Sequence, residues 1–233
     1  MSIQGLIFDF DGLILETEEP IFISWQELYR DYGCQLTLEV WQAIIGTSNA
    51  DALFDPAKEL DRLVGRNLNW AELEPVRRKR ELDVVYSLAP LPGVREMLDD
   101  ARQVGLKIAI ASSSPCSWVT GHLERLALMD YFDCIVTEDD VSHTKPDPEL
   151  FLKALDCLGL DASQAVVFED SLNGVLAAKR AGLYVVAVPT VMTRNLALDQ
   201  ADLRLSSLAQ VRLVELLERI ELGEWASGPA GGR

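Results

Sequence analysis

The sequence is short of positive charge. Lysine and arginine total 21 against 37 aspartates and glutamates, which gives a formal net charge of -16. Nucleic acids and anionic membrane surfaces are bound through basic patches, so this balance argues against both as partners. An anionic small molecule remains compatible with it, because a bound cation can reverse the field inside one cleft.

Long apolar runs and paired cysteines are also missing. The apolar N-terminus is broken by Asp9 and Asp11, which is unlike a signal peptide, and no run has the length of a membrane span. The four cysteines are Cys34, Cys116, Cys134 and Cys157. They form no CxxC pair, so they indicate neither a zinc site nor a disulfide framework. We expect free thiols, no membrane partner and a cytoplasmic location.

What the sequence does contain is a series of short, continuously apolar runs. They lie at 5–8, 107–111, 134–137, 165–168 and 184–188. Continuous runs are typical of strands covered on both faces, as in parallel sheets. Helical patterns at 93–105 and 148–159 lie between them, and each ends in a glycine that suits a helix C-terminus. The alternation predicts an α/β fold with a doubly wound parallel sheet.

One long interval departs from this alternation. From about residue 16 to residue 89 the patterns are helical, and no comparable strand occurs. The two prolines of "LAPLPGV" suit a linker at which the chain returns to the sheet. We therefore predict an α/β catalytic core from residues 1–15 and 90–233, with a helical cap domain at 16–89 inserted after the first strand.

Polar residues follow four of the predicted strands. Ligands of an open parallel sheet bind beyond the carboxyl ends of its strands, so these residues are expected at one edge. In chain order they are Asp9, Asp11 and Gly12, then Ser112 and Ser113, then Lys145, then Glu169 and Asp170. Each alone has an ordinary explanation as a turn, a polar loop or a helix cap. Those explanations do not account for the whole set at one edge.

The set has the chemistry of a site for a phosphate dianion. Carboxylates from two strands repel, and at an effective dielectric near 20 a pair about 4 Å apart costs about 4 kcal/mol. A Mg²⁺ ion would remove that cost, because it prefers carboxylate, water and phosphate oxygens. Hydroxyls and a lysine can bind phosphate oxygens, and a carboxylate screened in this way can act as a nucleophile.

These motifs resemble the haloacid dehalogenase superfamily over nearly the whole chain. The likeness rests on "DFDG" after the first strand, a serine after the second, "KPDP", and then "ED" before the helix "GVLAAKRAG". Within the superfamily, the chain is similar to the branch of β-phosphoglucomutase and the sugar-phosphate phosphatases. The resemblance implies a Rossmann-like core with a cap and Mg²⁺ as cofactor. It also implies a small phosphorylated metabolite, such as a sugar phosphate, as the substrate of a phosphatase.

The resemblance also implies a role for each matching residue. Asp9 would attack phosphorus to form an aspartyl-phosphate, while Asp11 would protonate the leaving oxygen and later activate water. Ser112 would hydrogen-bond the phosphoryl group, and Lys145 would neutralise it. The implied metal ligands are Asp9, Asp11 through its backbone carbonyl, Asp170 and, in support of the metal shell, Glu169.

Substrate contacts are less specific. The candidates are Gly12, Ser113, Glu19, Thr47 and Arg78. Arg78 belongs to the basic run 77–80, which could contact a second anionic group. We favour a solvated helix face in which the run pairs with Glu72, Glu74 and Glu81. The tryptophans are expected to pack in the core or the cap, and the protein is expected to be a monomer or a weak dimer.

The sequence favours hydrolysis over its alternatives. Asp11 and Asp170 favour phosphoryl chemistry, because the dehalogenases of this superfamily manage without the second aspartate and without Mg²⁺. The β-phosphoglucomutase pattern has a histidine four residues before a tryptophan, where this chain has Ile21 before Trp25, and an arginine where it has Asn49. The alternatives that remain are a phosphosugar mutase of that type and a regulatory module that binds phosphate without catalysis.

Overall fold

The structure is a computed structural model that describes residues 2–47 and 54–223. Its centre is a parallel six-stranded sheet with the strand order β3-β2-β1-β4-β5-β6. The strands are β1 (Gly5–Phe8), β2 (Lys107–Ala111), β3 (Cys134–Val136), β4 (Ala165–Glu169), β5 (Tyr184–Ala187) and β6 (Leu203–Arg204). The five predicted strands are confirmed. Strand β6 was not predicted, because it has two residues and is too short for a recognisable apolar run.

Helices cover both faces of the sheet, which explains why the strands are continuously apolar. Because successive side chains of a strand point to opposite faces, Leu6 and Phe8 belong to one hydrophobic cluster and Ile7 to another. The first cluster packs under α5 (Val94–Gln103), α6 (Cys116–Arg125) and α9 (Leu213–Leu222), and the second under α7 (Glu149–Leu158) and α8 (Leu172–Arg180). The doubly wound α/β fold is therefore confirmed.

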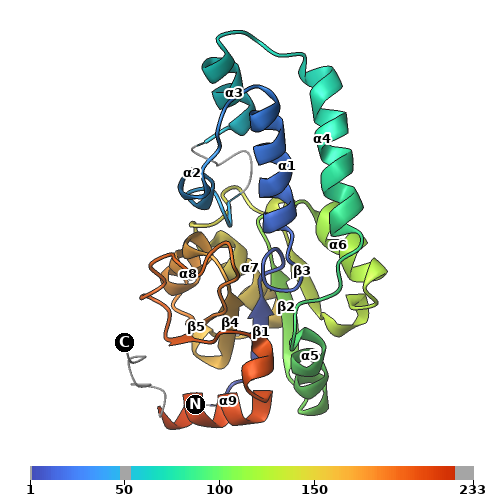
Figure 1. Ribbon diagram of the computed structural model, residues 1–233. Helices are drawn as coiled ribbons and strands as arrows, with labels where there is room; N and C mark the ends of the chain where they lie inside the picture. Colours follow the sequence, from blue (N-terminus) through green and yellow to red (C-terminus); the bar gives the residue numbers. More distant parts are fainter. Residues whose placement is uncertain (1, 48–53, 224–233) are drawn as a thin grey trace.

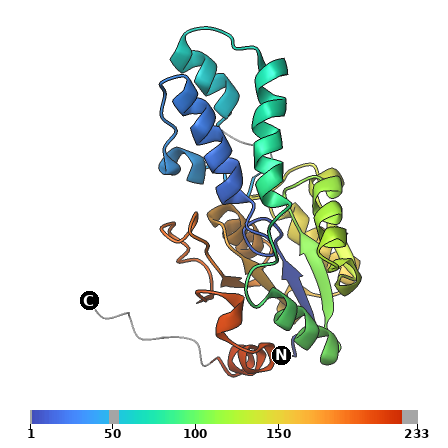
Figure 2. The ribbon, with the colours of Figure 1, turned by 45° about the vertical axis from the view of Figure 1, so that its right-hand side comes forward.

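In the described part of the chain, four further helices stand beyond the carboxyl edge of the sheet (Figure 1). They are α1 (Glu18–Asp31), α2 (Leu38–Gln42), α3 (Pro56–Val64) and α4 (Trp70–Val85), and we call them the helical cap. The cap has a hydrophobic cluster of its own, which includes Phe22, Trp25 and Leu60. In it α1 and α4 lie side by side (Figure 2), with Arg77 of α4 4.3 Å from the ring centroid of Trp25. The helical insertion after the first strand is confirmed.

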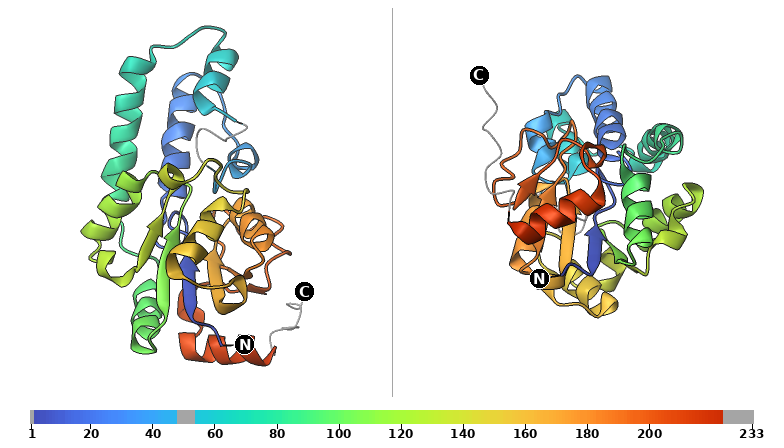
Figure 3. Two further views of the ribbon diagram at one scale, coloured as in Figure 1. Left: turned by 180° about the vertical axis from the view of Figure 1, so that it is seen from behind. Right: turned by 90° about the horizontal axis from the view of Figure 1, so that it is seen from below.

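The helical cap rests directly on the α/β core. The Ser113 hydroxyl donates to the Gly46 carbonyl at 2.9 Å, and the Asn173 side-chain amide donates to the Ile45 carbonyl at 2.9 Å. Met192 of the core packs into the cap's hydrophobic cluster. Seen from behind, α9 lies at the far end of the sheet from the cap (Figure 3). In this arrangement the cap covers the sheet edge at which the polar residues were predicted.

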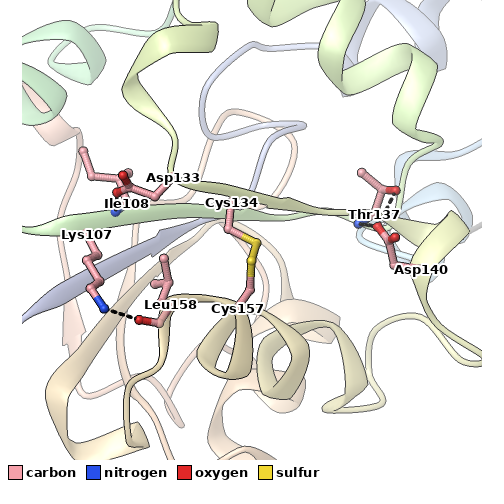
Figure 4. Close-up of a disulfide and its surroundings, with 8 residues drawn as sticks. All are labelled: Lys107, Ile108, Asp133, Cys134, Thr137, Asp140, Cys157 and Leu158. Atoms are coloured by element: carbon pink, nitrogen blue, oxygen red, sulfur yellow. Dashed lines mark hydrogen bonds between the residues drawn. A yellow bond between two sulfur atoms is a disulfide. The ribbon is translucent and has the colours of Figure 1, made fainter.

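The prediction of free thiols is wrong for two of the four cysteines. Cys134 of β3 and Cys157 of α7 form a disulfide, with Cα atoms 6.3 Å apart (Figure 4). The pair is 23 residues apart in the chain, and its sequence spacing carries no motif. It forms because α7 packs against β3, which only the tertiary structure reveals. Cys34 and Cys116 are free thiols in the described part of the chain.

The described helices differ from membrane spans in length or in polarity. Within residues 2–47 and 54–223, none combines the length and the apolar character needed to cross a bilayer.

Candidate active site

Asp9 stands where β1 ends at the carboxyl edge of the sheet. Phe8 is in register with Ile110 of β2 on one side and Phe168 of β4 on the other. The backbone N–H of Asp9 extends this pairing by donating to the Phe168 carbonyl at 3.0 Å. The Asp9 carboxylate is therefore held between two neighbouring strands, and only 4% of the residue's surface is exposed.

Lys145 bonds two carboxylates at this edge. Its buried ammonium group donates to Asp9 Oδ1 at 2.6 Å and to Glu169 Oε1 at 2.7 Å. It also lies 5.1 Å from the ring centroid of Phe151. Burial lowers the pKa of Lys145, but the two carboxylates outweigh burial and raise the pKa above its usual value. Lys145 is therefore charged in the folded protein.

Asp170 adds a third buried carboxylate. One oxygen each of Asp9, Glu169 and Asp170 lie within 4.8 Å of one another. Among the described residues, Asp170 Oδ1 has no hydrogen-bond partner, and Oδ2 accepts only a 3.3 Å bond from Thr193. Burial and then the neighbouring carboxylates raise the pKa of Asp170 well above its usual value. Burial likewise raises the pKa of Asp9 to about 7, against the attraction of Lys145.

This donor set fits a hard divalent cation. The cluster holds three carboxyl groups and Lys145 bonds only two of them, and Mg²⁺ prefers oxygen ligands of this kind. Both Glu169 oxygens are already used, because Oε1 accepts from Lys145 and Oε2 from the N–H and hydroxyl of Ser171. Asp9 and the unpartnered oxygen of Asp170 are therefore the direct ligands that the geometry favours, with Glu169 behind them.

Two glycines make room for the carboxylates. A Cβ atom on Gly12, whose φ is +79°, would lie 2.4 Å from Asp170 Oδ2. A Cβ atom on Gly174 in α8 would lie 1.7 Å from Glu169 Oε1. The N–H of Gly12, predicted to contact substrate, donates instead to the Leu15 carbonyl at 2.8 Å. The absence of a Cβ atom on Gly12 thus allows its close approach to Asp170. Its predicted contact with substrate remains a prediction.

Asp11, the second aspartate of "DFDG", is held apart from this cluster. Its Oδ1 accepts from the Thr17 hydroxyl at 2.5 Å and from the Trp118 indole N–H at 2.9 Å. Its Oδ2 accepts from the Ser114 hydroxyl at 2.6 Å. The two aspartates therefore have different surroundings, because Asp9 faces a lysine and other carboxylates whereas Asp11 faces neutral donors.

The two predicted serines occupy different positions. Ser112 is buried, its N–H donates to the Val136 carbonyl of β3 at 3.0 Å, and its hydroxyl oxygen accepts the N–H of Ser114 at 3.1 Å. Ser113 turns toward the helical cap and bonds Gly46, as described above. Ser112 therefore lies in the sheet edge, and Ser113 lies in the contact between core and cap.

The remaining cap candidates are spread more widely. The Thr47 hydroxyl donates to the Ile44 carbonyl at 2.8 Å, next to the Gly46 contact. Glu19 is exposed at the start of α1. Asn49 lies outside the described residues.

The basic run on α4 is paired, as favoured from the sequence, but it is not simply a solvated face. Arg77 is buried and pairs with Glu74 and Glu81 at 2.6 Å each. Arg78 also pairs with Glu81, and its guanidinium carbon lies 4.9 Å from the ring centroid of Trp118. Arg78 therefore points from the cap toward the core.

Two residues beside the site, Glu18 and Trp118, were not predicted from the sequence. The Trp41 indole donates to Glu18 Oε2 at 3.4 Å. Burial, and after it the charge of Asp11, raise the pKa of Glu18 to about 8. Glu19, the neighbouring residue, was the candidate predicted from the sequence. Adjacent helical residues point about 100° apart, so the start of α1 decides which of the two glutamates faces the core. Trp118 was assigned to packing, and nothing in "SSSPCSW" indicates its bond to Asp11.

Comparison with known proteins identifies relatives over nearly the full chain. A family model described as "Haloacid dehalogenase-like hydrolase" matches residues 6–188. The Bacillus subtilis protein "Putative phosphatase YhcW" is 44% identical over 94% of this chain and 98% of its own length. The "Phosphorylated carbohydrates phosphatase" of Thermotoga maritima is 34% identical over 77% of this chain and 82% of its own.

Solved structures show the same fold. The crystal structure of β-phosphoglucomutase from Clostridium difficile superposes with a TM-score of 0.75 at 22% identity. The match covers 95% of this chain and 99% of that one. At this identity the likeness shows the fold and no more.

Proposed function

The chain belongs to the haloacid dehalogenase-like hydrolase family, and from this premise we propose that it is a Mg²⁺-dependent phosphatase of a small phosphorylated metabolite. The observation that carries the proposal is the buried group in which Lys145 bonds Asp9 and Glu169, with Asp170 beside them. Phosphatase names among the relatives support the same reaction class.

In the first half of the reaction, a carboxylate oxygen of Asp9 attacks the phosphorus atom and the ester bond breaks. The leaving oxygen takes a proton from Asp11, and the phosphoryl group stays on Asp9 as an aspartyl-phosphate. In the second half, water attacks that phosphorus and gives its proton to Asp11. Phosphate leaves, and the Asp9 carboxylate is restored.

Positive charge makes this attack workable. Lys145 would neutralise phosphoryl oxygens next to Asp9, and Ser112 would donate a hydrogen bond to them. Mg²⁺, held by Asp9, Asp170 and the Asp11 backbone carbonyl, would supply further charge against the phosphoryl group. Glu169 would orient Lys145 through their 2.7 Å bond.

We further propose a sugar phosphate as the substrate. The Thermotoga maritima relative is named for phosphorylated carbohydrates. Burial raises the pKa of Glu18, and a protonated Glu18 near Asp11 would donate a hydrogen bond to a substrate hydroxyl. Ser113, Thr47 and Arg78 remain our further candidates for substrate contact, together with the exposed Glu19. The cytoplasmic location and the monomeric state also remain predictions.

A phosphosugar mutase would share the first half of this reaction. It would need a cap that keeps water away from the phosphorylated aspartate while the sugar turns over. Ile21, at the position of the mutase histidine, packs against the cap's hydrophobic cluster and carries no group that can move a proton. This observation favours hydrolysis.

A panel of phosphate monoesters, assayed for released phosphate with Mg²⁺ present, tests the proposal. Wild-type protein should hydrolyse members of the panel, and Asp9→Asn should abolish hydrolysis of all of them. Asp31→Asn, an exposed aspartate of α1, is the control that should keep activity. Hydrolysis that survives Asp9→Asn, or no turnover of the whole panel, would reject the phosphatase. Conversion of a sugar 1-phosphate to an isomer, dependent on a bisphosphate primer, would favour the mutase.

A further inference from the structure

We propose that Trp118 is a positioning residue for Asp11. Through Trp118, the position of the helical cap relative to the core affects proton transfer by Asp11. The proposal rests on the proposed function, because it assumes that Asp11 exchanges protons during phosphoryl transfer. It is carried by two contacts of one indole ring, a hydrogen bond to Asp11 on its nitrogen edge and a cation–π contact with Arg78 on its face.

The Asp11 carboxylate is oriented by donors from three separate segments. Thr17 stands at the N-terminus of α1, where the chain enters the cap, and Ser114 lies in the loop after β2. Trp118 lies in the first turn of α6, a helix of the core. Thr17 and Trp118 share Oδ1. Removal of the indole N–H would therefore leave Thr17, on the segment that leads into α1, as the one donor to that oxygen among residues 2–47 and 54–223.

The indole ring lies between the core and the cap. On the core side it meets the buried His122 ring edge-on, with ring centroids 4.3 Å apart. His122 is in turn stacked 6.2 Å from the ring of Phe10, next to Asp11 in the chain. On the cap side the Arg78 guanidinium lies over the ring at 4.9 Å. The orientation of the indole N–H therefore depends on both parts of the molecule.

Arg78 is itself fixed to the body of the cap. It pairs with Glu81, which is fully buried and also bonds Arg77 at 2.6 Å. Arg77 donates to the Ser24 hydroxyl of α1 at 2.8 Å and packs over Trp25, so α1 and α4 hold this group together. A displacement of the cap would carry Arg78 with it and remove one of the two supports of the indole.

The consequence for the reaction is specific. A carboxylate that is held less firmly is a poorer proton donor to the leaving oxygen, because proton transfer needs hydrogen-bond geometry. A leaving group that departs without a proton is insensitive to this defect. Trp118 should therefore matter for poor leaving groups and much less for good ones, whereas a residue that only stabilises the fold would affect both equally.

The test compares Trp118→Phe with wild type on phenyl phosphate and on p-nitrophenyl phosphate, which differ in leaving group and little in shape. We expect kcat/KM to fall about 10-fold to 100-fold for phenyl phosphate and less than about threefold for p-nitrophenyl phosphate. Asp11→Asn should show the same selectivity in stronger form. Equal losses for both substrates, or no loss, would overturn the proposal.

Trp70→Phe is the matched control. Trp70 also donates its indole N–H to a carboxylate, Asp61 Oδ2, at 3.0 Å, but within the cap. It should leave the ratio of the two kcat/KM values unchanged, whatever it does to thermal stability. A shift of that ratio as large as in Trp118→Phe would also overturn the proposal.

The cap's part in the proposal is tested by Arg78→Met alone and combined with Trp118→Phe. We expect the single change to lower kcat/KM about threefold to tenfold for phenyl phosphate only, and to add nothing in the double variant. Fully additive effects with a raised KM for both substrates would mean that Arg78 acts on substrate directly, and would overturn the link to the cap.

The two proposals fail in different ways. If wild type turns over phosphate monoesters and Asp9→Asn does not, an unchanged leaving-group ratio in Trp118→Phe rejects only the positioning role. If wild type has no turnover that depends on Asp9, the proposed function is rejected, and the role of Trp118 with it.

Discussion

The sheet half and the cap half of the site are built by different means. In the sheet half, Asp9 and Asp170 directly follow strand ends, and backbone pairing sets their places. In the cap half, contact with the core depends on single side chains, such as the bond from Ser113 to Gly46. Changes in the sheet half should therefore abolish turnover, and changes in the cap half should adjust it.

Lys145→Met is expected to have the largest effect and to test the sheet half directly. It leaves the buried carboxylates of Asp9 and Glu169 without their shared cation. We expect turnover to fall on the order of 10³-fold. The free energy of unfolding of the Mg²⁺-free protein should fall by about 3 kcal/mol, because an unpaired buried charge remains.

The assays are hydrolysis of p-nitrophenyl phosphate and urea denaturation. Lys58→Met, an exposed lysine of α3 paired with Asp55, is the matched control and should change neither. Full turnover in the Lys145 variant would contradict the claim that changes in the sheet half abolish turnover.

Gly174→Ala tests whether Glu169 must keep its exact place behind the metal ligands. The new Cβ atom would overlap Glu169 Oε1, so that carboxylate must shift. We expect the Mg²⁺ concentration for half-maximal activity to rise about 10-fold to 100-fold, as for other residues that orient metal ligands. Titration of activity with Mg²⁺ measures it.

Gly121→Ala in α6 provides the contrast for this change. Its Cβ atom would meet nothing within 4 Å among the described residues, so it should leave the Mg²⁺ dependence unchanged. It should raise stability by up to about 1 kcal/mol. Similar Mg²⁺ curves for both variants would contradict a special position for Glu169.

The pH dependence of the free energy of unfolding tests the carboxylates of the sheet half. The pKa of Asp9 is about 7 in the folded protein and about 3.9 when unfolded, so the folded state binds more protons between those values. The free energy of unfolding without Mg²⁺ should therefore decrease as pH rises from about 4 to about 7. Mg²⁺ competes with these protons, so its stabilisation should be small near pH 5 and larger near pH 8.

Thermal unfolding with Mg²⁺ or with a chelator measures this effect. At a Mg²⁺ concentration of about 100 times Kd, near pH 8, the gain should be about 2.7 kcal/mol. Asp9→Asn removes one of the groups whose pKa is raised and should make the curve of the metal-free protein less steep. Stabilisation by Mg²⁺ that is equal at all pH values would count against a site made of these carboxylates.

Ser113→Ala should have the smallest effect, since it removes one hydrogen bond between core and cap. A net loss of about 1 kcal/mol corresponds to a rise in KM of about fivefold, with kcat nearly unchanged. Steady-state kinetics measure KM and kcat on a phosphate monoester that the wild-type protein hydrolyses. Ser117→Ala, on the surface of α6, is the control. A fall in kcat at constant KM would place Ser113 in the chemical step instead.

The same division explains what the sequence could predict. Asp9, Lys145 and Asp170 could be grouped because parallel strands deliver their carboxyl ends to one edge, so chain order alone brings them together. The strands were predicted from continuous apolar runs, because a sheet covered on both faces has apolar side chains at successive positions. The apolar runs and the polar residues that follow them are both short stretches of sequence, and each predicts a definite place in the fold.

The cap contacts and the disulfide carry no such signal. Whether Glu18 or Glu19 faces the site depends on where α1 starts, and the bond from Trp118 to Asp11 joins residues 107 positions apart. The Cys134–Cys157 pair depends on α7 packing against β3. Each arises from tertiary packing, which spacing and residue type do not encode.

The most direct test of the account is to detect the phosphoryl group on Asp9. Asp11→Asn, which should slow hydrolysis of the intermediate, is mixed with p-nitrophenyl phosphate and Mg²⁺, quenched in acid and digested for mass spectrometry. We predict one added phosphoryl group on the peptide that contains Asp9, converted to homoserine by borohydride reduction. Release of nitrophenol with no phosphoryl group on that peptide, or with the group on another residue, would contradict the central claim.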